Sequence, residues 1–347
     1  MAAEPNGEAG AGGFGPWRQA ARRLARNRVA LAFLGLFVLI VVFVLAAPLW
    51  ADDVAHTGPN QTHTLEKITV DGERRDVVNP EGKPIGPVWL GADGKFFLGA
   101  DSRLGRDEMV RLMYGGRTSL FISIVAALIT SVLATVFALL SGYYRGWTDS
   151  VISRSMDVLW AFPVLLIAIA LGLALAVGGL QLGPIHISGG SIWIPILIIG
   201  VVSVPYMARP LRGEVLTLRE KEFVESAVGQ GASSFRIMFG ELLPNLWSTI
   251  IVFSALGVAN NLLLESALSF LGVGVQAPNA SWGSMIATGQ DLITSSPLLT
   301  IIPGTMILLT VLSLNVFADG LRDALDPRSK VRLEARVGVA EPEGTAV

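Results

Sequence analysis

The sequence predicts an all-α polytopic membrane protein with six transmembrane helices. Of its 347 residues, 52% are hydrophobic and only 16% are charged, whereas about 25% of a soluble domain is charged. The charges are also unevenly spaced, and they leave apolar runs long enough for a helix of about 20 residues to cross a bilayer. Helices are expected because lipid offers backbone groups no other partner, and the runs lack the alternation of a membrane barrel.

One uncharged stretch, between Asp157 and Arg209, is too long for a single crossing. The Gly-rich segment 177–190 interrupts it, so we divide it into two spans. The first apolar run, residues 29–50, contains Ala46-Ala47-Pro48, which resembles a signal-peptide cleavage site. This run is longer than the apolar core of a signal peptide, which has about 7–15 residues, and its length therefore favours a retained membrane anchor. The predicted spans are 29–50, 118–144, about 157–177, about 191–209, about 246–268 and about 298–318.

Basic residues predict the orientation of the chain, because short basic flanks stay in the cytoplasm. Five arginines lie between residues 18 and 28, and we therefore expect residues 1–28 to form a cytoplasmic tail. Its stretch 17–28 predicts a basic helix that lies on the anionic inner leaflet or serves only to fix the topology. Six crossings return residues 321–347 to the cytoplasm as a C-terminal tail. Segment 51–117 then falls outside, and its many basic residues are tolerated there because loops longer than about 60 residues escape the rule.

Within the outer segment, residues 55–97 alternate short β-prone pieces (KITV, RDVV, PVWL and KFF) with turn pairs such as Asp71-Gly72. This pattern predicts a small extracytoplasmic insertion of β-hairpin character. His56 and His63 could bind a metal, but two histidines without a third ligand are more often surface residues, and the chain has no cysteine. We therefore predict no metal site. The net charge of −2 provides no basic excess for nucleic acid.

The loop 210–245, between the fourth and fifth spans, predicts two short helices. Apolar residues at helical spacing over 218–228 indicate an amphipathic helix, which glycines at 229 and 231 end. Ser233 or Ser234 can cap a second helix, and Pro244 ends or kinks it. Such helices, with apolar side chains on a charged loop, are suited to a groove in another protein or to packing on the chain's own bundle. Both interpretations remain open.

The spacing of certain residues within this loop resembles a motif of a known protein family. Glu225-Ser226-Ala227 is followed after three residues by Gly231 and, after nine more, by Glu241-Leu242-Leu243-Pro244. This pattern resembles the EAA loop of ATP-binding-cassette (ABC) importer permeases. Ser226 replaces an alanine of the family pattern, and Glu241 stands where an apolar residue or histidine is more usual. Further segments resemble the C-type subunits of dipeptide and oligopeptide permeases: 98–120, 142–163, 265–285 and 319–328.

The resemblance implies a type I ABC importer permease fold, with residues 118–320 as the permease core, in a bacterial cytoplasmic membrane. It implies a half-channel that pairs with a second, related permease, two cytoplasmic ATPases and an extracytoplasmic substrate-binding protein. The implied solutes are di- or oligopeptides, with nickel chelates or another small solute as the alternative. A self-sufficient carrier or channel is the competing class. The coupling residues implied by the EAA loop are Glu225, Ser226, Ala227, Gly231, Phe235, Phe239, Leu243 and Pro244.

The chain itself is expected to be a non-catalytic subunit. It contains no G-x-x-x-x-G-K-[ST] loop that could cradle nucleotide phosphates. We therefore expect no directly bound cofactor, and we expect ATP and Mg²⁺ to be held by the partner ATPases. No polar cluster with catalytic spacing lies within the spans, which argues against a membrane enzyme.

Polar residues on or near the fifth span suggest a path for solute. A carboxylate within a membrane costs about 2.5–3.5 kcal/mol and therefore usually faces protein or water. We expect this face to line the path or the permease seam, unless Glu265 simply ends the span at the outer interface. Asp157 and Pro163, on the third span, mark either a gate or a helix boundary. The five residues of the fifth-span face are Asn260, Asn261, Glu265, Ser266 and Ser269.

Overall fold

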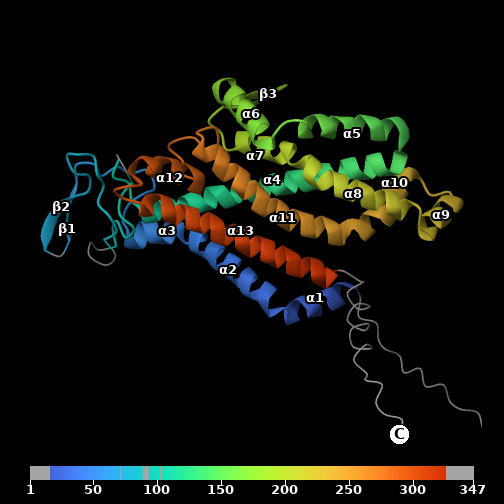
Figure 1. Ribbon diagram of the computed structural model, residues 1–347, viewed down its shortest axis with the longest axis horizontal. Helices are drawn as coiled ribbons and strands as arrows, with labels where there is room; N and C mark the ends of the chain where they lie inside the picture. Colours follow the sequence, from blue (N-terminus) through green and yellow to red (C-terminus); the bar gives the residue numbers. More distant parts are fainter. Residues whose placement is uncertain (1–15, 71, 89–93, 102–103, 326–347) are drawn as a thin grey trace, which may run out of the picture.

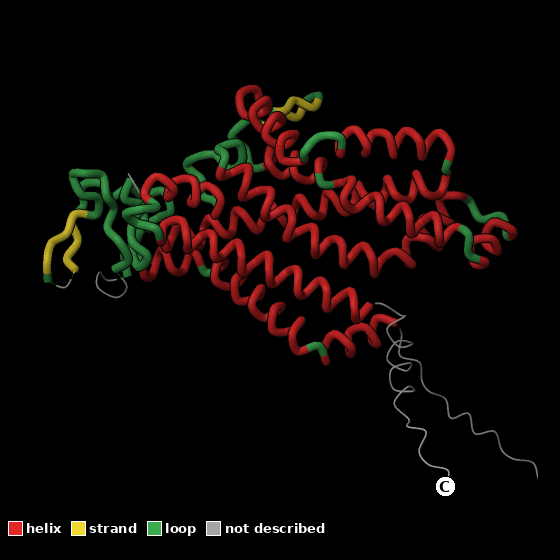
Figure 2. Tube along the Cα trace, viewed as in Figure 1, coloured by secondary structure: helices red, strands yellow, loops and turns green. Residues whose placement is uncertain are grey.

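Long helices dominate the computed structural model, which describes residues 16–70, 72–88, 94–101 and 104–325. Figure 1 shows these helices running side by side along the molecule, with strands β1 and β2 at one end and the short helix α9 at the other. Figure 2 shows how little of the described chain is strand. The helices are α1 (Pro16–Arg26), α2 (Arg28–Leu45), α3 (Ala47–Leu49), α4 (Glu108–Tyr144), α5 (Gly146–Trp160), α6 (Val164–Gly178), α7 (Trp193–Val202), α8 (Val204–Arg219), α9 (Glu222–Gly229), α10 (Ser234–Arg236), α11 (Leu243–Phe270), α12 (Trp282–Gly289) and α13 (Leu298–Leu325).

The polytopic helical prediction is confirmed. Five helical segments of the described chain are long and apolar enough to cross a membrane, and the α5–α6 pair makes a sixth when its two bent halves count as one span. α2, α4 and α13 are three of the five. The other two join adjacent elements into the continuous segments Trp193–Arg219 and Ser234–Phe270.

The third span differs from the predicted helix over 157–177. Helix α5 begins at Gly146, and helical structure is interrupted at 161–163. Helix α6 then follows at an angle of 86° to α5. Pro163 explains the break, because proline lacks an N–H group and disfavours helical geometry in the residue before it. Pro163 is accordingly the N-cap residue of α6.

The fourth span also runs further than the predicted 191–209. Helix α8 continues to Arg219 because its apolar side, including Leu211 and Val215, is buried against α4. The predicted amphipathic helix over 218–228 is therefore divided. Its first residues end α8, and α9 starts only at Glu222.

Pro244 does not end the helix that precedes the fifth span. It lies in the first turn of α11, directly after a π-helical segment, η2 (Ile237–Leu242). The wider π turn accommodates a proline that cannot donate a backbone hydrogen bond. The short helix α10, segment η2 and span α11 consequently form one continuous helical segment.

The β-hairpin prediction is confirmed for the piece KITV, whereas the second strand begins two residues before the piece RDVV and contains only its first two residues. Strands β1 (Lys67–Val70) and β2 (Glu73–Asp76) pair antiparallel around Gly72, whose φ is +81°. The piece KFF lies in turns, and the second half of PVWL falls outside the described residues. Neither the second hairpin, β3 (Leu180–Leu182) with β4 (Ile185–Ile187), nor α12 was expected, because both are short and lie in Gly-rich or polar loops.

Helix α4 lies at the centre of the bundle and packs against α2, α7, α8 and α11. Small residues make these close approaches possible. A methyl group on Gly116 would lie 2.4 Å from Val44 Cγ1 of α2 and 2.6 Å from Trp282 Cζ2 of α12. Trp282 is fully buried there, and its indole Nε1 donates a hydrogen bond to the Leu112 carbonyl at 2.9 Å.

Gly116→Ala is expected to lower the free energy of unfolding by about 1–3 kcal/mol, because overpacking in a dense core forces neighbouring side chains to shift. Thermal unfolding of the detergent-solubilised protein measures the effect. Gly35→Ala in α2 is the matched control, since nothing lies within 4 Å of its added methyl group. Equal melting temperatures for the two variants would contradict the packing of α2 and α12 on α4.

Candidate functional site

The EAA loop lies at the end of the bundle opposite to β1 and β2 (Figure 1). One face of it is built into the bundle. Val224 of α9 and Ile237 and Leu242 of η2 are buried in the same cluster as Leu139 of α4 and Leu211 of α8. The expectation that the loop packs on its own bundle therefore holds for this face.

A tight turn joins α9 to α10. Gly231 has a φ of +76°, and nothing lies within 4 Å of a methyl group added there, so the turn needs glycine for its backbone conformation and not for space. The Ala232 amide donates to the Ala227 carbonyl at 3.0 Å, which closes the turn. The Ser233 hydroxyl accepts from the Arg236 amide and caps α10, as one of the two predicted capping residues.

The opposite face of the loop carries exposed apolar and acidic side chains. Phe235 is 68% exposed and Phe239 is 42% exposed, and their ring centroids lie 4.5 Å apart. Glu225 and Ser226 are exposed on α9, Ala227 is half-buried, and Pro244 is exposed next to half-buried Leu243. Glu225 and Ser226 of α9, Phe235 of α10 and Phe239 of η2 are exposed in the described chain, whereas Pro244 lines a cavity described below. We call Glu225, Ser226, Phe235 and Phe239 together the EAA face.

Asp157 and Pro163 occupy different parts of the bent third span. Arg209 of α8 donates to the Asp157 carboxylate at 2.6 Å, and its guanidinium lies 4.1 Å from the centre of the Trp160 ring. Further toward the EAA loop, Arg212 donates from Nε and Nη2 to both carboxylate oxygens of Asp149, each at 2.6 Å. These bonds attach α5 to α8, while Pro163 lies at the bend beyond them.

The five polar residues of the fifth span do not share one accessible face. Asn261, Glu265, Ser266 and Ser269 are buried, and only Asn260 is exposed. Four of these side chains offer little free surface in the single chain, and the role of the five residues in a path or a permease seam stays a prediction. Asn261 accepts a hydrogen bond from Ser203, at the break between α7 and α8, at 3.0 Å.

The Glu265 carboxyl group is hydrogen-bonded inside the protein. The Ser269 hydroxyl donates to it at 2.7 Å and the Ser266 hydroxyl at 3.4 Å. The Trp282 amide donates to Ser119 Oγ at 3.1 Å. A polar group that would be costly in the membrane is thereby satisfied inside the protein.

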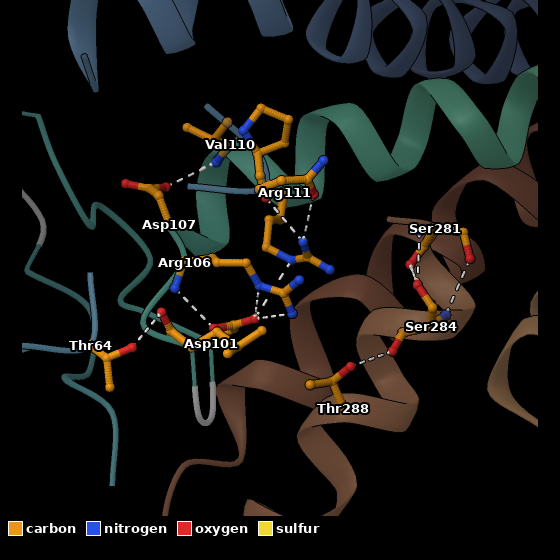
Figure 3. Close-up of polar contacts among 12 residues, drawn as sticks. Thr64, Asp101, Arg106, Asp107, Val110, Arg111, Ser281, Ser284 and Thr288 are labelled. Carbon is orange, nitrogen blue, oxygen red and sulfur yellow. Dashed lines mark hydrogen bonds and ion pairs between the residues drawn. The ribbon is translucent and has the colours of Figure 1, made fainter. Parts of the chain in front are cut away.

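A second polar cluster, which the sequence pattern does not reveal, lies at the N-terminal end of α4 (Figure 3). Asp101 accepts a hydrogen bond from Arg106 Nε at 2.6 Å and lies 3.8 Å from Arg111 Nε. Arg111 also donates to the Pro59 carbonyl at 3.0 Å, which attaches the outer segment to α4. No periodicity marks such a cluster, because its members meet only when the outer segment folds back onto the helix.

Asp107 caps the outer end of α4. Its carboxylate accepts from the Val110 amide at 3.0 Å and from the Phe96 amide at 2.6 Å. Burial raises the pKa of Asp107 above its ordinary value, and the two amide hydrogen bonds partly oppose this shift. The cap and the Phe96 contact together hold the chain that leads into α4 in a fixed position.

The two histidines of the outer segment have structural partners. His63 lies within hydrogen-bonding distance of Glu66 and of the Thr57 hydroxyl, at 2.5 and 2.8 Å, and His56 Nδ1 lies 2.7 Å from the Asp52 carbonyl. Within the described ranges, no three acidic or histidine side chains gather as a metal site would require.

A large cavity opens at the end of the bundle that carries the EAA loop. Its volume is about 990 Å³, and α1, α8, α11 and α13 form its walls. Charged side chains reach it from three of these helices: Arg23 from α1, Glu214 from α8 and Arg322 from α13. This grouping cannot be predicted from the sequence, since the three residues are far apart in the chain.

Comparisons with known proteins place these features in a family. Residues 134–331 match the family described as binding-protein-dependent transport system inner membrane component. Residues 15–65 match the N-terminal TM domain of oligopeptide transport permease C. The first match alone spans more than half of the 347 residues.

Curated relatives align over nearly the whole chain. The dipeptide transport system permease protein DppC of Alkalihalophilus pseudofirmus is 34% identical over 316 residues, which cover 91% of each chain. The glutathione transport system permease protein GsiD of Pectobacterium atrosepticum is 35% identical, with 91% of this chain and 92% of that one covered. The oligopeptide transport system permease protein OppC of Haemophilus influenzae is 32% identical, with 90% and 89% covered.

A solved structure shares the fold. A chain of the MetNI methionine ABC transporter, in inward-facing conformations, superposes with a TM-score of 0.51 at 14% sequence identity, and the match covers 63% of this chain and 97% of that one. The family match and the relatives at 32–35% identity are stronger evidence than this likeness in fold. The chain therefore belongs to the binding-protein-dependent transport system inner membrane component family and is a multi-pass permease of an ABC transporter.

Proposed function

We propose that this chain is one of two permease subunits of an ATP-driven importer for short peptides. The relatives named above support peptides as the solute class, because they are named for dipeptides, oligopeptides and glutathione, which is itself a tripeptide. Nickel chelates remain the alternative solute. In this proposal the second permease supplies the other half of the translocation path.

The proposed complex has partners on both sides of a bacterial cytoplasmic membrane. Two ATPase subunits, which hold ATP and Mg²⁺, dock on the EAA face, and a substrate-binding protein delivers solute on the side of β1 and β2. Both termini lie in the cytoplasm. The separation of the EAA loop from β1 and β2 by the length of the bundle supports this arrangement (Figure 1). The family description, which names binding-protein dependence, supports it as well.

The observation that carries the proposal is the two-sided character of the EAA loop. Phe235 and Phe239 are exposed as a partner surface requires, while Val224, Ile237 and Leu242 are buried in the bundle. Protein interiors are densely packed and transmit displacement with little compression. Closure of the ATPases around ATP would therefore move the loop and tilt the attached helices as a rigid body.

Replacing both exposed phenylalanines tests the docking surface. The double variant Phe235→Ala, Phe239→Ala is expected to fold normally but to lose at least about ten-fold in ATP-dependent peptide uptake, because aromatic anchors often contribute about 2 kcal/mol or more each to an interface. Uptake by proteoliposomes that contain the full complex, together with co-purification of the ATPases, measures the loss.

Phe121→Ala is the matched control, since Phe121 is a similarly exposed phenylalanine (45%) on α4, away from the EAA loop. Uptake that matches the wild type in the double variant would contradict docking at the EAA face. Uptake by the chain reconstituted without any ATPase would instead establish the competing class, a self-sufficient carrier or channel.

The turn at Gly231 provides a second prediction. Gly231→Asn should retain more ATP-dependent uptake than Gly231→Val, because asparagine tolerates a positive φ whereas a β-branched residue is strained there. Both variants find open space around the side chain, so clashes do not explain a difference. If the two variants transport equally well, the left-handed turn is not needed for coupling.

A further inference from the structure

The inner cavity is large enough for a peptide. Its volume of about 990 Å³ lies at the upper end of the range of about 300–1,000 Å³ for small-molecule sites. Its walls come from the inner ends of α8, α11 and α13 and from α1. Two of these helices, α8 and α11, contact the EAA loop, and η2 of that loop leads directly into α11.

The charges in the cavity come from different walls. Glu214 lies on α8 and lines the cavity together with Thr249 of α11. Arg322 lies on α13 and Arg23 on α1. One acidic group and two basic groups, supplied by separate helices, therefore surround a common space.

The rest of the lining is both polar and apolar. Asn245, Ser248 and Thr249 of α11 and Gln19 of α1 line the same cavity, and so do apolar side chains of all four helices. A groove that is built only for lipid or for helix packing is lined by apolar and small residues. Ionisable groups in membrane helices instead mark water-filled cavities and substrate pathways. The lining is thus suited to a charged, hydrogen-bonding solute.

We propose that this cavity is a solute site for zwitterionic short peptides, in which Glu214 binds the ammonium group and Arg322 binds the carboxylate. The inference rests on the proposed function and deepens it, since it names the groups of the solute that this chain recognises. A free peptide carries both charges at neutral pH, so that it complements both walls at once. Charge-assisted hydrogen bonds of this kind are stronger than neutral ones.

Cysteine labelling can test the site directly, because the chain contains no cysteine. Ser248→Cys places a thiol in the cavity, and Thr217→Cys on α8 places one at an exposed position outside the lining. The full complex with both permeases and the ATPases, reconstituted without ATP, is labelled with an impermeant maleimide from the ATPase side. Labelling of this chain is followed with and without millimolar Ala-Ala.

Ala-Ala is expected to slow labelling of the Ser248→Cys protein several-fold and to leave the Thr217→Cys protein unaffected. N-acetyl-Ala-Ala amide, which lacks both terminal charges, should give no protection. Adding Glu214→Gln should abolish the protection by Ala-Ala, and Glu214→Asp should retain most of it because the carboxylate is kept. Arg322→Gln should weaken protection by Ala-Ala more than protection by Ala-Ala amide, which has no carboxylate.

Three results would overturn the proposal. A Ser248→Cys thiol that cannot be labelled in the complex means that the second permease fills the groove. Equal protection by Ala-Ala and its blocked form means that charge is not recognised, and unchanged protection in Glu214→Gln means that Glu214 does not bind the ammonium group. Peptide uptake by the wild-type complex is measured separately. Its absence would refute the proposed import function, whereas the labelling, which needs no ATP, reports on the cavity alone.

Discussion

Burial of one face of the EAA loop against α4, α8 and α11 is the contact on which the rest of the molecule depends. Val224, Ile237 and Leu242 leave no room for the loop to move independently of these helices. The same contact orients the loop so that Phe235 and Phe239 face outward. The loop is thus a rigid extension of the bundle, which is the physical requirement for any partner that acts by pushing on it.

Helices α4 and α11 extend this rigid connection to the end of the bundle that carries β1 and β2. There α11 packs against α4 and α12, and Trp282 packs closely against Gly116. Asp107 and Arg111 attach the outer segment to the same end of α4 (Figure 3). A displacement that starts at the EAA loop can therefore reach both ends of the proposed path through packed and hydrogen-bonded contacts.

The bent third span is attached in a different way. Its inner half, α5, is held to α8 by the pairs Asp149–Arg212 and Asp157–Arg209. Beyond the bend at Pro163, apolar α6 packs instead against α7. Directional ionic bonds on one side of the bend and non-directional packing on the other leave the two halves with different partners, so that they need not move together.

Much of this architecture follows from the sequence alone, for a physical reason. Lipid cannot hydrogen-bond to the backbone, so each uncharged run must form a helix, and the gaps between charges place the six spans. The spacing from Glu225 through Gly231 to Pro244 likewise marks the EAA loop, because a turn with a positive φ and a proline in the first helical turn are local requirements. Such features depend on neighbours in the chain and are therefore readable from it.

Only the tertiary structure decided the features that join distant residues. Glu265 and Asn260 are close in sequence and equally polar, yet one is buried in a serine network and the other is exposed. The extension of α8 to Arg219 and the position of α12 both depend on which surfaces α4 presents. The cavity that brings Arg23, Glu214 and Arg322 together arises from four helices at once. Contacts of this kind are set by packing between segments, which leaves no periodic trace in the sequence.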